Sequence, residues 1–105
     1  MPPREPLHKY VVKALDAAAD AHQQFGKGDL AGSIRNSAKT GKLCPHAKTT
    51  LRRHLEELES ALSGHQVQLA FAKTPDASSH NVEKIRAKIK ATEDKMNAVR
   101  AALGQ

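Results

Sequence analysis

The sequence predicts an all-α protein in which a helix-turn-helix-like unit of three helices is followed by a long antiparallel helical hairpin. Apolar residues recur three and four positions apart along the chain, and no stretch of useful length alternates apolar and polar residues as a strand does. Prolines and glycines divide this pattern into separate helices. Aromatic residues make up 3% of the 105 residues, so the core must consist of Ala, Leu, Val and Ile.

The first two helices are short. One is expected over residues 7–24, ending before Gly26, and its apolar stripe comprises Leu7, Val11, Leu15, Ala18, Ala19 and, as the next position, Phe25. A second helix follows, with Asp29 as its cap and an apolar residue at every fourth position, namely Leu30, Ile34 and Ala38. Residues 39–42, Lys-Thr-Gly-Lys, interrupt the pattern.

The remaining helices are longer. Pro45 suits the first turn of the third helix, whose stripe comprises Leu51, Leu55, Leu58, Leu62, His65 and Leu69. Gly64 leaves open whether this helix is continuous. A turn is expected over residues 74–79, and the last helix, which should end at Gly104, has the stripe Val82, Ile85, Ile89, Thr92, Met96, Val99 and Leu103.

Three regions are expected: a flexible N-terminus over residues 1–6, a basic region over residues 7–55, and a hairpin over residues 56–105. The alternating spacing of the two long stripes is typical of helices that pack on one another. The stripes therefore form either the core of the hairpin or a surface for a homodimer, where Thr92 and His65 would set the register. The two interpretations are compatible.

Positive charge is concentrated in one part of the chain. The net charge is +6, and residues 26–54 contain seven basic residues and one acidic residue, whereas residues 56–105 contain seven of each. Lys and Arg neutralise phosphates, and Ser and Thr hydroxyls hydrogen-bond them. We expect the nucleic-acid-binding residues to be Lys27, Ser33, Arg35, Lys39, Lys42, Lys48, Thr49, Thr50, Arg52 and Arg53.

The order of these helices is that of a helix-turn-helix, in which the second helix of the motif enters the major groove of duplex DNA. The third helix would occupy this position, and its contacting residues would be Lys48, Thr49, Thr50, Arg52 and Arg53. Phosphates would be bound by Arg35, Lys39 and Lys42. The connection, expected over residues 39–46, is longer than the usual three or four residues.

Residues 17–20, 29–35 and 49–55 resemble small DNA-binding proteins in which an N-terminal helix-turn-helix leads into a coiled coil, such as plasmid KfrA-type regulators and transposon accessory proteins. The resemblance covers about half of the chain. It implies a dimeric DNA-binding protein of a mobile element or phage, with the Thr and Arg side chains of the third helix facing DNA. The expected length of the connection departs from this pattern.

Other functions have less support in the sequence. Single-stranded nucleic acid is disfavoured because at least two of the three aromatic residues, Tyr10, Phe25 and Phe71, lie on stripes that should be buried. Cys44 and His46 lack a second pair of metal ligands, and we expect no metal, no cofactor and no enzymatic activity. The polar N-terminus and the lone cysteine favour a cytoplasmic protein without a membrane segment.

Two alternatives for the basic surface remain open. The chain could be a helical protein-interaction module, such as a phage-encoded inhibitor or an assembly adaptor, that binds an acidic protein partner. It could also bind RNA through its shape and its phosphates.

Overall fold

The computed structural model describes residues 7–72 and 79–104, which form four α-helices and no strand. The helices are α1 (Lys9–Gln24), α2 (Gly28–Thr40), α3 (Pro45–Ala72) and α4 (Ser79–Leu103). The all-α prediction is therefore confirmed. The segment 1–6 and most of the turn expected over 74–79 lie outside the described residues.

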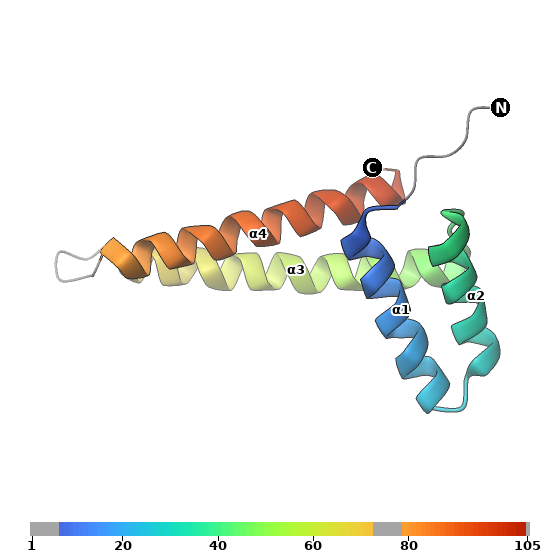
Figure 1. Ribbon diagram of the computed structural model, residues 1–105. Helices are drawn as coiled ribbons and strands as arrows, with labels where there is room; N and C mark the ends of the chain where they lie inside the picture. Colours follow the sequence, from blue (N-terminus) through green and yellow to red (C-terminus); the bar gives the residue numbers. More distant parts are fainter. Residues whose placement is uncertain (1–6, 73–78, 105) are drawn as a thin grey trace.

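The helices form two antiparallel pairs, α1 with α2 and α3 with α4 (Figure 1). α1 packs mainly on α2, and this α1–α2 pair lies across the N-terminal half of α3, while α4 runs back along α3. The third helix of the basic region and the first arm of the hairpin are thus one helix of 28 residues, continuous through Gly64. The boundary expected between residues 55 and 56 lies within it.

The core lies where all four helices meet. Its fully buried side chains are Val11, Leu15, Ala19, Ala31, Ile34, Ala47, Leu51 and Val99, with Leu55, Leu58, Ala38 and Met96 almost as well covered. Among the described residues, none from 59 to 91 is buried. The distal half of the hairpin is two helices thick, so its seam residues Leu62, Leu69, Ile85 and Ile89 are half-buried.

The long apolar stripes of α3 and α4 face each other within the chain. Leu55 and Leu58 of α3 belong to the same buried cluster as Met96 and Val99 of α4. Thr92 is also buried, and its hydroxyl donates to the carbonyl of Lys88 at 2.8 Å, which satisfies this polar group inside its own helix. The stripes therefore form the core of the hairpin.

The glycine and proline signals place most helix ends correctly. Gly26 and Gly41 follow α1 and α2 with φ angles of 77° and 78°, the left-handed conformation that glycine adopts without strain. α3 begins at Pro45 as predicted. The prediction that Asp29 caps α2 is wrong: Lys27 is the N-cap residue and makes no side-chain cap, and Asp29 lies in the first turn, where its charge complements the helix dipole.

The expectation that most aromatic side chains are buried is also wrong. Phe25 is 81% exposed because it follows the last turn of α1, at the point where the chain reverses into α2. Phe71 is 75% exposed on the outer side of α3. Phe25 follows the C-terminal end of α1 and Phe71 lies in the last turn of α3, and these two helix ends are far apart (Figure 1), so the two side chains do not form a stacking platform for successive bases.

Candidate nucleic-acid interface

The connection between α2 and α3 has four residues, Gly41 to Cys44. The sequence had indicated a longer connection over residues 39–46. It is shorter because Lys39 and Thr40 complete the last turn of α2, and Pro45 and His46 already belong to α3. Four residues, one of them glycine, is the usual length for the turn of a helix-turn-helix. The expectation of a connection over residues 39–46 is therefore wrong.

A buried hydroxyl fixes the start of α3. Ser37 is 1% exposed; its Oγ donates to the carbonyl of Ser33 at 3.1 Å and accepts the amide of Cys44 at 3.0 Å. Cys44 in turn acts as a helix cap, because its Sγ accepts the amide of Ala47 at 3.4 Å. The sequence pattern did not single out Ser37 as a buried residue, although its place between Ile34 and Ala38 puts it on the apolar face of α2.

The thiol of Cys44 has a perturbed acidity as a result. Burial raises its pKa, but hydrogen bonds with the Ser37 hydroxyl and with the backbone amides of Ala47 and His46 lower it by more, so that the pKa of Cys44 lies below its ordinary value. Donors at a helix N-terminus stabilise the thiolate in this way.

The first turns of α3 present a basic face to solvent. Ala47 and Leu51 are fully buried and hold the helix against the core, whereas Lys48, Arg52 and Arg53 are exposed. Over the part of the chain that the structure describes, none of these three cations is in an ion pair. An anionic partner could therefore pair with them without the loss of an existing ion pair.

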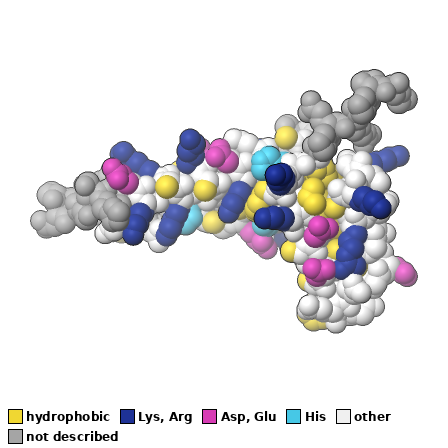
Figure 2. Space-filling view, viewed as in Figure 1, with side chains coloured by type: hydrophobic (Ala, Val, Ile, Leu, Met, Phe, Trp, Pro, Cys, Tyr) yellow, Lys and Arg dark blue, Asp and Glu magenta, His cyan; other side chains and the backbone are white. Residues whose placement is uncertain are grey.

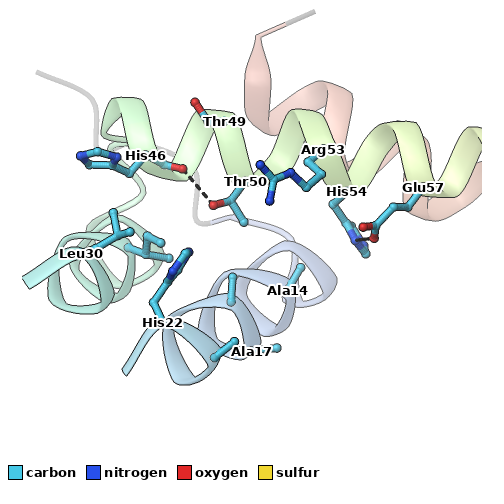
Figure 3. A pocket seen from close by; sticks show the side chains of 13 residues that line it. Ala14, Ala17, His22, Leu30, His46, Thr49, Thr50, Arg53, His54 and Glu57 are labelled. Atoms are coloured by element: carbon cyan, nitrogen blue, oxygen red, sulfur yellow. Dashed lines mark hydrogen bonds and ion pairs between the residues drawn. The ribbon is translucent and has the colours of Figure 1, made fainter. Parts of the chain in front are cut away.

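The two threonines of this segment are oriented by their own helix. Thr49 Oγ1 donates to the carbonyl of Pro45 at 3.0 Å, and Thr50 Oγ1 donates to that of His46 at 2.9 Å (Figure 3). Their hydroxyl hydrogens are therefore engaged, and they offer acceptor lone pairs outward. Thr49 is exposed, whereas Thr50 is half-buried.

The other predicted contact residues are distributed along α2. Lys39 is exposed in the last turn of α2 and Lys42 is exposed in the turn that leads into α3, whereas Lys27 lies at the opposite end of α2, about 20 Å away for a helix of this length. Arg35 forms an ion pair with Asp20 of α1 at 2.6 Å. Ser33 donates its hydroxyl to the carbonyl of Asp29 at 3.2 Å. The structure therefore groups Lys39 and Lys42 with the start of α3 and separates Lys27 from it.

A cleft of about 540 Å³ separates α1 from α3 beside this basic face. Its wall on α1 consists of alanines and His22, while α3 contributes polar side chains (Figure 3); the lining residues are Ala14, Ala17, Ala18, Ala21, His22, Leu30, Ile34, His46, Thr49, Thr50, Arg53, His54 and Glu57. Arg53 lines this cleft and Arg52 does not. The two adjacent arginines thus point to different sides of α3.

A polar array closes one end of the cleft and was not foreseen in the sequence. The hydroxyl of Tyr10 is hydrogen-bonded to Nε2 of His54, and Nδ1 of His54 lies 3.6 Å from Oε2 of Glu57. Lys95 of α4 lies over the Tyr10 ring, 5.4 Å from its centre. Burial and the negative charge of Glu57 raise the pKa of Tyr10. This array holds α1 to α3 and α4 where the core reaches the surface.

Neither a cluster of metal ligands nor a membrane-spanning helix is found among the described residues. In residues 7–72 and 79–104, no three His, Cys, Asp or Glu side chains come together as metal ligands would. None of the described helices is long and apolar enough to cross a membrane. No protein-family model, curated protein or solved structure matches the chain.

Proposed function

We propose that the protein binds duplex DNA through the first two turns of α3. The observation that carries this proposal is the arrangement of α2, a four-residue turn and α3, with Lys48 and Arg52 exposed and unpaired on the outer face of α3. A helix placed in this way enters the major groove with its N-terminal residues against the base edges. Arginine there can bind guanine in a bidentate manner.

The charge pattern limits the contact to one end of α3. Glu56, Glu57 and Glu59 follow the basic turns directly and would repel phosphates. On the other side lie Lys39, at the end of α2, and Lys42, in the turn, where they can bind the backbone that flanks the groove. Arg53 would reach a phosphate from the edge of the cleft, and Arg35 would do so after release from Asp20.

Lysines and arginines are also present along the hairpin (Figure 2). There, however, acidic residues balance them, since residues 56–105 have seven charges of each sign. The net positive charge of the chain is therefore that of residues 26–54, which contain all of α2, the turn and the start of α3. This supports a polyanion as the partner of that region.

The test is the affinity for a labelled duplex at several salt concentrations. The slope of log affinity against log salt is negative, and each lost phosphate contact lowers its magnitude by about 0.9, which is close to a tenfold loss of affinity at 0.1 M salt. We expect Lys48→Ala combined with Arg52→Ala to lower the magnitude of the slope by up to about 1.8. The matched control is Arg86→Ala with Lys88→Ala, which removes two exposed cations from α4 and should change the affinity little.

Two results of this titration would contradict the proposal. Equal losses in the two double variants would show that binding depends on overall charge and not on α3. Displacement of the duplex by structured RNA at lower concentration than by unlabelled duplex would make RNA the preferred ligand.

The cleft beside Arg53 favours a second candidate function, the binding of an acidic segment of a partner protein. Its alanine wall would accept the apolar side of a helix, and Arg53 would pair with a carboxylate. Substitution of Ala17 by Gln fills the cleft from an exposed position. It should abolish binding of an acidic helical peptide and leave duplex binding unchanged.

We also propose that two copies act together, because helix-turn-helix proteins usually bind two half-sites as dimers. The heptad stripes of α3 and α4 are used within the chain. Self-association therefore needs a different surface.

A further inference from the structure

The outer face of distal α3 has an unusual composition for an exposed surface. From Ser60 to Ala72 the chain contains no Lys, Arg, Asp or Glu, although most of these side chains are exposed. Val67 is 55% exposed and Phe71 is 75% exposed. Large apolar side chains grouped on a surface without charges mark an interaction site.

Small residues precede the two large ones on the same side of the helix. Ser60, Gly64, Val67 and Phe71 are spaced by four, three and four residues, so they form one face. The half-buried seam residues Leu62 and Leu69 lie on the side toward α4. The face made by Ser60, Gly64, Val67 and Phe71, here called the α3 outer face, therefore points away from the hairpin partner.

Gly64 forms a notch in this face. A Cβ atom added to Gly64 would meet no atom within 4 Å, so the space above its backbone is open. Small residues at such positions let another helix approach the backbone closely. The α3 outer face thus offers both a large side chain, Phe71, and a place that can receive one.

We propose that the α3 outer face pairs with the same face of a second copy of this chain, with the two α3 helices antiparallel. A two-fold axis between residues 67 and 68 places residue 71 of each copy opposite residue 64 of the other. Phe71 of each chain then fills the Gly64 notch of its partner, and both contacts form at once, as a two-fold interface requires.

Charge favours this pairing over one made by α4. The α3 outer face has no charged residue, so two copies meet without repulsion. The first half of α4 has four cations, Lys84, Arg86, Lys88 and Lys90, against Glu83, and two such segments would repel each other. The contact covers about three helical turns. It therefore buries less than the ~800 Å² per partner that is typical of stable interfaces. We therefore expect a dimer that dissociates at micromolar concentration.

This inference names the surface for the self-association in the proposed function, and it is tested without DNA. Sedimentation equilibrium of the wild-type chain over a wide concentration range should show a monomer–dimer equilibrium. Phe71→Glu should be monomeric throughout. Gln66→Glu adds the same charge at an exposed position on a different side of α3 and should dimerise as the wild type does.

Two further variants separate loss of association from loss of folding. Gly64→Leu raises the helix propensity of α3 but fills the notch, so it should leave helicity unchanged or higher and abolish the dimer. Position 67 lies next to the proposed axis, so Val67→Cys in a Cys44→Ser background should form a covalent dimer on oxidation. Gln66→Cys in the same background should not.

A wild-type chain that stays monomeric, or a Phe71→Glu variant that dimerises normally, would overturn the inference. Faster covalent dimerisation of the Gln66→Cys variant than of the Val67→Cys variant would also overturn it. Duplex binding is read out separately: wild-type protein that dimerises without binding duplex would contradict the proposed function alone.

Discussion

Replacing Leu51 by alanine is expected to lower the free energy of unfolding by about 3 kcal/mol. Leu51 has no exposed surface and lies in the cluster formed by Leu15 of α1, Ile34 of α2 and Val99 of α4. Loss of its three outer carbons removes about 2.4 kcal/mol of transfer free energy at 0.8 kcal/mol per carbon. A cavity term adds to this loss, and buried Leu→Ala changes commonly cost 2–5 kcal/mol.

The measurement is urea unfolding followed by circular dichroism of the helices. For a chain of this size, whose total stability is on the order of 5–15 kcal/mol, the midpoint should fall by about 2 M at a slope near 1.5 kcal/mol/M. Leu69→Ala is the matched control, because Leu69 belongs to the same stripe of α3 but is half-buried. It should cost less than half as much. Equal losses would refute the view that the core is confined to the junction of the four helices.

Three further predictions concern the groups around the interface. Because burial and Glu57 raise the pKa of Tyr10, its contribution to stability is complete below pH ~10 and is lost as pH rises through the raised pKa; Tyr10→Phe should show a smaller loss of urea midpoint between pH ~9 and ~11. The lowered pKa of Cys44 predicts that its alkylation rate rises at a lower pH in the folded protein than in the urea-unfolded chain; identical profiles would contradict this. Asp20→Ala releases Arg35 from an exposed ion pair, so it should cost less than about 1 kcal/mol of stability and raise the affinity for duplex DNA in the titration above; a lower affinity would remove Arg35 from the proposed contacts.

Local signals in the sequence were sufficient for the helices themselves. Apolar spacing located all four, and Gly26, Pro45 and Gly104 marked ends that the structure confirms. The apolar spacing wrongly predicted a buried Phe25, because the spacing of the stripe continues in the sequence beyond the end of α1, where the chain turns. It could not decide on Gly64 either, because packing against α4 maintains α3 through a residue of low helix propensity.

Less of the candidate site than of the fold could be predicted from the sequence. The basic segment could be located by counting charges, but the pairing of Arg35 with Asp20 joins two helices and has no local signal. The array of Tyr10, His54 and Lys95 joins three helices and is equally invisible in the sequence. The turn appeared too long because Lys39 and Thr40 resemble loop residues, whereas α2 ends only at the left-handed Gly41, whose amide donates to the carbonyl of Ser37.

The most direct test of the central claim is an NMR titration of the chain with a short duplex, followed through its backbone amide signals. We expect the signals that shift most to cluster in the turn and the first two turns of α3, residues 41–53, and those of α4 to change little. Shifts centred on the cations of α4 between residues 84 and 90, or no shifts at low salt, would contradict it.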